Sequence, residues 1–127
     1  MRHGSLKLKA QFLCGNAIAL GPGKVDLLEA IADTGSISAA GRRLGMSYRR
    51  AWLLVDEMNR CFEGPLVATR GARGAIVTAL GDQTRRAYRQ LEAKLDRSLA
   101  ADPAFKLLSQ SLRTDPLPHK AGTASSR

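Results

Sequence analysis

Apolar residues in the first third of the chain recur at steps of three and four, which is the repeat of one helical face. The positions that follow this repeat are Val25, Leu27, Leu28, Ile31 and Ala32. Pro22 suits the first turn of a helix because its φ is fixed, and Gly35 can adopt the positive φ that ends one. The pattern therefore predicts a helix over residues 22–34.

Two shorter helical patterns follow and meet at a corner over residues 45–47 (GMS). Ser36 or Ser38 is expected to cap the first and Ser47 the second, because a serine hydroxyl can accept a free backbone N–H. The inward positions of the first helix are expected to be Ile37, Ala40 and Leu44. The buried stripe of the second is expected to be Ala51, Val55, Met58 and Phe62. Residues 34–62 thus predict a helix-turn-helix, around which the chain is organised.

Stretches on either side of this unit predict β-hairpins. Residues 6–12 (LKLKAQF) alternate apolar and polar positions, and residues 18–20 return after a Gly-Asn turn. After the third helix, residues 66–70 and 75–78 flank a glycine-rich turn with a cation at its tip. A hairpin directly behind a recognition helix predicts the wing of a winged helix.

Thr78 is expected to cap a long helix over about residues 79–100. The apolar stripe of this helix has no further apolar layer in the sequence to cover it, which favours a two-helix dimer seam. The alternative is that the stripe packs on its own domain, as its first turns are expected to do. The residues assigned to the seam are Leu80, Tyr88, Leu91, Leu95 and Leu99.

The predicted fold class is mainly α (α+β): a winged helix-turn-helix with an N-terminal β-hairpin, a wing hairpin and a long C-terminal dimerisation helix. This domain is expected to cover residues 1–100. Residues 101–127 are expected to form a polar, disordered tail, in which residues 104–112 can form one short helical stretch.

Charge adds a partner to this picture. The formal net charge is +9 and the sequence pI is about 10.4, which favours a polyanion such as nucleic acid. No apolar run approaches the ~20 residues of a membrane span, so no membrane partner is expected. The two cysteines, Cys14 and Cys61, in a chain with no export signal, are expected to be reduced thiols of a cytoplasmic protein.

The start of the third helix is the expected point of DNA reading, because side chains there reach base edges in the major groove. The residues assigned to it are Ser47, Tyr48, Arg49, Arg50 and Leu53. Arg49 or Arg50 could bind guanine, and the alternative for both is a solvated helix face. Trp52 is interpreted as a partly buried packing residue rather than a base contact.

Further contacts are expected with the DNA backbone, which supply affinity without sequence information. The residues assigned to these contacts are Ser36, Ser38, Arg42 and Arg43, and the wing adds Arg70 at its base and Arg73 at its tip as further DNA-binding candidates. Arg73, at the tip of the wing, could enter a minor groove or could simply be solvated. Arg85, Arg86 and Arg89 are interpreted as a solvated face of the long helix.

No catalytic constellation is recognisable, and no enzyme activity, cofactor or metal is expected. The histidines, His3 and His119, lie in terminal segments far from either cysteine. The sequence has no Cys-x-x-Cys motif, no phosphate-binding glycine-rich loop and no pair of carboxylates suited to acid–base work. Asp56 and Glu57 are interpreted as a helix-surface pair.

Several short motifs together resemble one known family. They are residues 27–31 (LLEAI), 34–40 (TGSISAA), 45–48 (GMSY), 51–52 (AW) and 55–59 (VDEMN). Their combination closely resembles the N-terminal domain of the ModE family of molybdate-responsive transcriptional regulators, which is a LysR-type winged helix. The resemblance covers roughly residues 7–99. The wing turn and residues 78–81 also fit, although Ala79 stands where the family usually has proline.

The resemblance implies a homodimer that binds double-stranded DNA at a palindromic operator and regulates transcription. Regulators of this family continue into a molybdate-binding domain, whereas this sequence ends after the long helix with a polar tail. We therefore expect either a stand-alone, ligand-independent relative or a sensor supplied by a separate polypeptide. The alternative function is a winged-helix module that binds a protein and does not recognise a DNA sequence.

Overall fold

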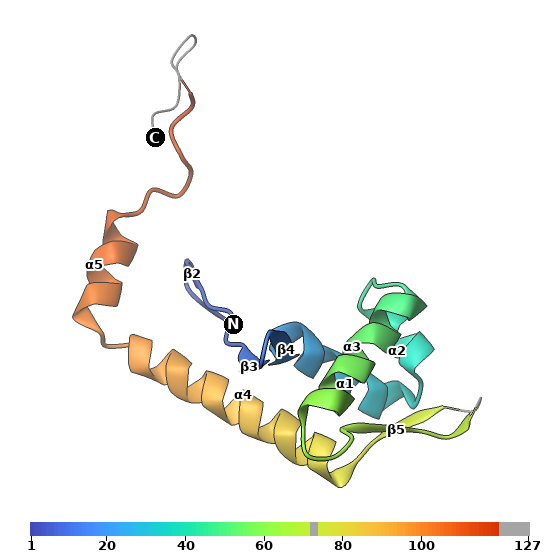
Figure 1. Cartoon of the computed structure of the whole chain (residues 1–127). Coiled ribbons are helices and arrows are strands. Elements are labelled where there is room, and N and C mark those ends of the chain that lie inside the picture. Colours follow the sequence, from blue (N-terminus) through green and yellow to red (C-terminus); the bar gives the residue numbers. More distant parts are fainter. Residues whose placement is uncertain (72–73, 120–127) are drawn as a thin grey trace.

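The computed structural model describes residues 1–71 and 74–119. Three helices form a compact body, and a long fourth helix runs along one side of it (Figure 1). The helices are α1 (Pro22–Thr34), α2 (Ile37–Arg43), α3 (Tyr48–Cys61), α4 (Ala79–Leu99) and α5 (Pro103–Ser111). The strands are β1 (Arg2–His3), β2 (Leu6–Lys7), β3 (Phe12–Cys14), β4 (Ala17–Leu20), β5 (Val67–Thr69) and β6 (Ala75–Val77). The α+β winged helix predicted from the sequence is confirmed.

Local capping chemistry sets the helix boundaries. Gly35 ends α1 with a φ of 70°, and its N–H donates to the carbonyl of Ile31. The hydroxyl of Ser36 caps α2 by accepting from the amide of Ala39, as the hydroxyl of Ser47 caps α3. The capping role offered to either Ser36 or Ser38 therefore falls to Ser36.

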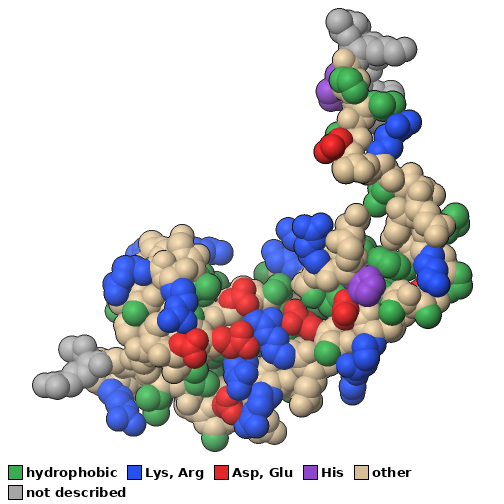
Figure 2. Space-filling model, turned by 180° about the vertical axis from the view of Figure 1, so that it is seen from behind, with side chains coloured by type: hydrophobic (Ala, Val, Ile, Leu, Met, Phe, Trp, Pro, Cys, Tyr) green, Lys and Arg blue, Asp and Glu red, His purple; other side chains and the backbone are tan. Residues whose placement is uncertain are grey.

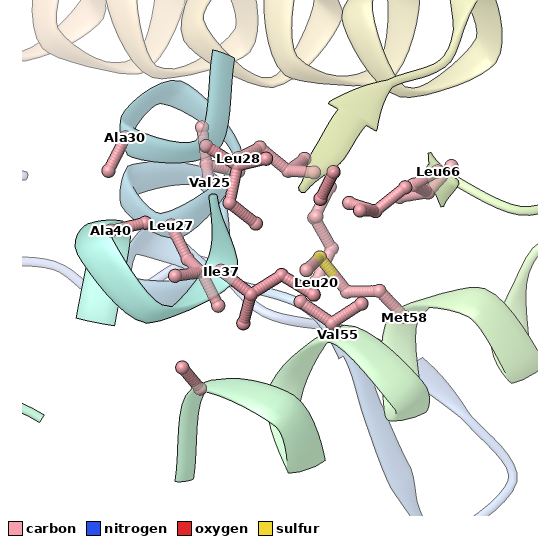
Figure 3. Close-up of a cluster of buried hydrophobic side chains, with 14 of the residues drawn as sticks. Leu20, Val25, Leu27, Leu28, Ala30, Ile37, Ala40, Val55, Met58 and Leu66 are labelled. Atoms are coloured by element: carbon pink, nitrogen blue, oxygen red, sulfur yellow. The ribbon is translucent and has the colours of Figure 1, made fainter. Parts of the chain in front are cut away.

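Helices α1, α2 and α3 turn their apolar faces toward one shared core (Figure 3). Leu27, Leu28 and Ile31 of α1 are fully buried, and Val55 and Met58 of α3 close the core from the other side. The predicted stripe of α3 is confirmed at its first three positions, and Phe62 packs against the edge of the core.

Leu44 departs from the prediction. It was expected to face inward, but its side chain is 36% exposed. Helix α2 ends at Arg43, and Leu44 forms its C-cap. Extrapolating the helical repeat past the last helical residue therefore placed Leu44 on the wrong side.

The N-terminal region contains two hairpins where one was predicted. Strand β1 pairs with β2, and β3 pairs with β4. The alternating stretch over residues 6–12 was expected to be one strand, but it is divided between β2 and β3. The break at residues 8–11 lets the Ala10 carbonyl accept a hydrogen bond from the hydroxyl of Tyr88 at 2.7 Å.

The wing is anchored at both ends. The amide of Ala75 donates to the carbonyl of Gly35 at 2.9 Å, which ties β6 to the turn between α1 and α2. At the other end, the hydroxyl of Thr78 donates to the carbonyls of Pro65 and Leu66 and caps α4 by accepting from the Gly81 amide. The predicted cap of the long helix is confirmed.

Two expectations for the C-terminal part need correction. Tyr88, assigned to a dimer seam, is 2% exposed and packs within the core of its own chain. The tail predicted to be disordered contains helix α5, close to the short helical stretch expected at residues 104–112. Asp102 caps this helix by accepting from the amide of Phe105 at 3.0 Å.

Gly81 provides a test of the junction between the wing and α4. A Cβ at this position would lie 2.2 Å from the carbonyl oxygen of Leu66. Alanine favours a helix by ~1 kcal/mol over glycine, but this contact forces the backbone to move. We expect Gly81→Ala to lower the free energy of unfolding by about 1–3 kcal/mol, measured by urea denaturation at a fixed protein concentration.

Gly23→Ala is the matched control, because a Cβ at Gly23 in α1 would meet nothing within 4 Å. Its free energy of unfolding should stay unchanged or rise by up to ~1 kcal/mol. Equal stabilities for the two variants would show that the approach between α4 and Leu66 is not a constraint.

Candidate nucleic-acid interface

The start of α3 presents a cationic, exposed surface. Arg49 and Arg50 follow the capping residue Ser47, and both side chains are exposed. The Ser47 hydroxyl accepts from the Arg50 amide at 3.1 Å, so its own hydrogen can still be donated. A helix N-terminus also carries free N–H groups and a partial positive charge, which attract phosphate.

Apolar side chains lie beside these arginines. Tyr48 and Leu53 are each 56% exposed, and Trp52 is 38% exposed. The indole N–H of Trp52 donates to the hydroxyl of Tyr48, which holds the two rings together one turn apart. Trp52 was interpreted as partly buried, and the structure places it at the edge of the exposed surface.

Helix α2 contributes two further arginines. Arg42 donates to the hydroxyl of Ser38 at 2.9 Å, and Arg43 forms an ion pair with Asp33 at 3.0 Å. Both partners of the Arg43 pair are more than half exposed, and such a pair contributes little stability. A phosphate could therefore replace Asp33 at small cost.

A shallow hollow of about 140 Å³ joins these elements. It lies between the start of α2, the start of α3 and the wing, and its lining includes Ser36, Ser38, Tyr48 and Trp52. The structure therefore brings together predicted contact residues that come from both helices of the helix-turn-helix. Arg70 is exposed at the base of the wing, and Arg73 lies outside the described residues.

The arginines of α4 belong to a different environment. Arg89 binds Glu29 and Asp26 of α1 and Glu92 of its own helix, and Arg85 bridges Glu29 and Asp82. Arg85, Arg86 and Arg89 were predicted to form a solvated face, but Arg85 and Arg89 hold α4 against α1. Arg86 is 64% exposed and pairs with Asp82 of its own helix. The hydrogen bond from Arg89 lowers the pKa of the Glu29 carboxyl, and the same contact raises the pKa of the Arg89 guanidinium.

The charges are thus divided between two regions. Acidic side chains gather where α1 meets α4, whereas Lys and Arg side chains lie over the lobe of α2 and α3 (Figure 2). Arg42, Arg49 and Arg50 form no ion pair within the described part of the chain. The surface formed by α2, the start of α3 and the base of the wing is therefore suited to a polyanion; we call it the cationic face.

Comparison with known proteins relates this part of the chain to a known family of regulators. Residues 23–82 match the model of the bacterial regulatory helix-turn-helix proteins of the LysR family. This segment is a LysR-type helix-turn-helix domain.

The LysR-type domain has relatives in named bacterial proteins. The molybdenum-pterin-binding protein MopB of Rhodobacter capsulatus is 40% identical over 106 residues, which are 75% of this chain and 39% of that protein. The DNA-binding transcriptional dual regulator ModE of Escherichia coli is 37% identical over 95 residues, which are 69% of this chain and 36% of that protein. The chain therefore spans less than two-fifths of the length of these relatives.

One solved structure with a similar arrangement is a transcriptional regulator of the LysR family from Eggerthella lenta. It is 19% identical, with a TM-score of 0.46, and the alignment covers 54% of this chain and 96% of that chain.

Within residues 1–71 and 74–119, none of the helices is both long enough and apolar enough to cross a membrane. The same residues contain no group of three or more metal-binding side chains.

Sequence reasoning missed Asn59, which positions the wing. Its side-chain oxygen accepts from the amides of Leu66 and Val67 at 2.9 and 3.1 Å, and its amide donates to the Val67 carbonyl at 2.9 Å. A polar residue directly after the buried Met58 in an apolar stripe was the available sign. Lys24 was also missed: it is 6% exposed, and it donates to Glu57 and to the Ile18 carbonyl, each at 2.6 Å.

Asn59 provides a test of how the LysR-type domain holds its wing. We expect Asn59→Ala to cost about 1–3 kcal/mol of unfolding free energy, because two amides of the β5 segment lose their acceptor. Hydrogen exchange at the amides of Leu66 and Val67 should accelerate. Arg60→Ala next to it is the control, since its exposed pair with Asp56 should contribute at most ~1 kcal/mol. Unchanged exchange at Leu66 would exclude the anchoring role.

Proposed function

We propose that this protein is a transcriptional regulator that binds double-stranded DNA through the cationic face. The observation that carries the proposal is the exposed start of α3, where arginines without acidic partners in the described structure stand beside exposed aromatic and apolar side chains. Arginine can bind guanine in the major groove, and apolar groups can contact thymine methyls. The LysR-type match over residues 23–82 supports this reading.

The two helices take different roles in this proposal. Arg49, Arg50, Tyr48 and Leu53 read base edges. Backbone contacts come from Ser36, Ser38, Arg42, Arg43, Ser47, Arg70 and Arg73. The Ser38 hydroxyl supports Arg42 from the turn below, at 2.9 Å, so that the guanidinium can meet a phosphate without losing its orientation.

The genes under control are proposed to be linked to molybdenum. This proposal rests on the names of the relatives, among them the molybdenum-pterin-binding protein MopB and the regulator ModE. The chain matches only part of each of these proteins, so no molybdate response is transferred to it. We expect that a separate molybdate sensor or another protein partner acts with this chain.

We also propose that the protein binds a palindromic operator as a homodimer. An apolar groove of about 590 Å³ lies between the β3–β4 hairpin and α4. Phe12 and Leu13 on the hairpin are 48% and 68% exposed, and Leu80 and Leu91 of α4 line the same groove. Leu95 and Leu99 continue the stripe as partly exposed residues. A second copy would cover this surface and place two α3 helices on successive half-sites.

The decisive measurement for base reading uses a duplex selected from a randomised library. We expect Arg49→Ala to weaken binding to the selected duplex by about 1–3 kcal/mol, with a much smaller loss on random duplex. Arg42→Ala should weaken binding to both, and should reduce the slope of log K against log salt concentration by about 1.

Arg97→Ala is the control, because it removes one positive charge from the last turn of α4, at the opposite end of that helix from the wing. Its affinity should stay close to that of the unchanged protein. If the binding of all DNA were insensitive to salt, the hypothesis of a protein-binding module would replace that of a DNA-binding regulator. If Arg49→Ala weakened binding to the selected and the random duplex equally, Arg49 would contact a phosphate and not a base.

The dimer is tested by the double change Leu91→Asp with Leu95→Asp. Two carboxylates in an apolar interface should dissociate the dimer, so the sedimentation coefficient should fall to that of a monomer while far-UV circular dichroism keeps its helical form. Leu107→Asp on α5, where the leucine is 65% exposed, introduces the same charge outside the stripe and should leave the assembly intact. An unchanged coefficient for the double variant would contradict the α4 interface.

A further inference from the structure

The two cysteines of the chain come from distant segments and meet at one surface. Cys14 ends strand β3 and is exposed, and Cys61 is the last residue of α3 and is partly exposed. Both are free thiols, and both line the apolar groove between the β3–β4 hairpin and α4. Strand β4 packs directly on α3, which brings the hairpin against the end of that helix.

The thiols also influence each other. Burial raises the pKa of the Cys61 thiol, and its interaction with the neighbouring Cys14 thiol raises it further. Such an interaction requires the two side chains to lie near each other. Folding alone produces this proximity, because the helices α1 and α2 separate the cysteines along the chain.

We propose that Cys14 and Cys61 form a thiol modification site, in which a low-molecular-weight disulfide converts the pair into an intramolecular disulfide. The bond would tie the β3–β4 hairpin to the C-terminal end of the recognition helix α3. This site lies apart from the cationic face and does not depend on DNA binding by that face.

The chemistry takes place in two exchange steps. The thiolate of Cys14, the more accessible of the two, attacks one sulfur of glutathione disulfide, forms a mixed disulfide and releases one glutathione thiolate. Cys61 then loses its proton to solvent and attacks the Cys14 sulfur, which releases the second glutathione. The protein loses two electrons and two protons, and the glutathione disulfide gains them as two thiols.

The order of the steps follows from the surroundings of each thiol. The thiolate is the attacking species, and a raised pKa reduces its population at Cys61. In the single chain, Cys14 is exposed at the start of the hairpin turn, where a small disulfide can approach before a second copy covers the groove. Cys61 therefore acts second, on a sulfur that the fold already holds beside it.

The experiment treats the full chain with glutathione disulfide under non-reducing conditions. Remaining thiols are labelled with a maleimide, and the intact mass and the disulfide-linked peptides are determined by mass spectrometry. We expect both thiols to be lost together, the mass to fall by two hydrogens, and a single linked peptide pair to contain Cys14 and Cys61. The oxidised chain should also melt at a higher temperature, because the cross-link restricts the unfolded state.

Serine variants test the two roles separately. Cys61→Ser should stop at a stable glutathione adduct on Cys14, and Cys14→Ser should form its adduct on Cys61 more slowly. The combination of Cys61→Ser with Glu63→Cys is the matched control, since it moves the thiol beyond the end of α3 to an exposed position. That variant should fail to form the internal disulfide while keeping the melting temperature of Cys61→Ser.

Two results would overturn the proposal. One is the accumulation of two glutathione adducts on the unchanged protein without closure of the internal bond. The other is a disulfide that links two chains, which would assign the thiols to an intermolecular contact.

Discussion

The arrangement of the cationic face depends on the contacts of Leu66. Its side chain is fully buried, its amide donates to Asn59 of α3, and its carbonyl accepts from Thr78. The same carbonyl leaves no room for a Cβ on Gly81, so α4 starts in direct contact with it. One residue thus joins the end of the recognition helix, the base of the wing and the start of the long helix. This junction and the hydrogen bond from the Ala75 amide to the Gly35 carbonyl together hold the wing in its orientation relative to α3.

The division of charge is the second constraint. The carboxylates of α1 face α4, where Glu29 and Asp26 take up Arg89 and Glu29 also meets Arg85. This leaves the arginines at the end of α2 and at the start of α3 with few acidic neighbours. The net charge of +9 does not show where the positive charge lies. Some of the arginines are paired with carboxylates where α1 meets α4. Lys and Arg side chains cover the lobe of α2 and α3, and further ones lie elsewhere on the same face of the molecule (Figure 2).

The sequence was informative wherever a feature depends on neighbours along the chain. Caps at Ser36, Ser47 and Thr78, the stop at Gly35 and the buried stripe of α3 follow from local hydrogen bonding and helical periodicity. The candidate contact residues on α2 and α3 were named for the same reason, because they stand at the ends of these two helices. Their contacts with DNA stay predictions.

What the sequence did not reveal depends on partners distant in the chain. Tyr88 fits an exposed stripe by its spacing, and only the approach of Ala10 from the N-terminal segment shows that it is buried. Arg85 and Arg89 of α4 were predicted to be solvated because the sequence does not show that carboxylates of α1 lie beside them.

The same argument explains Cys14 and Cys61. Each is an isolated thiol in the sequence, and the pair exists only because β4 packs against α3. Local patterns thus define the elements and caps, whereas the contacts between elements decide which side chains are used internally. Side chains that make no such internal contacts, at the cationic face and along the apolar groove, are available to a partner.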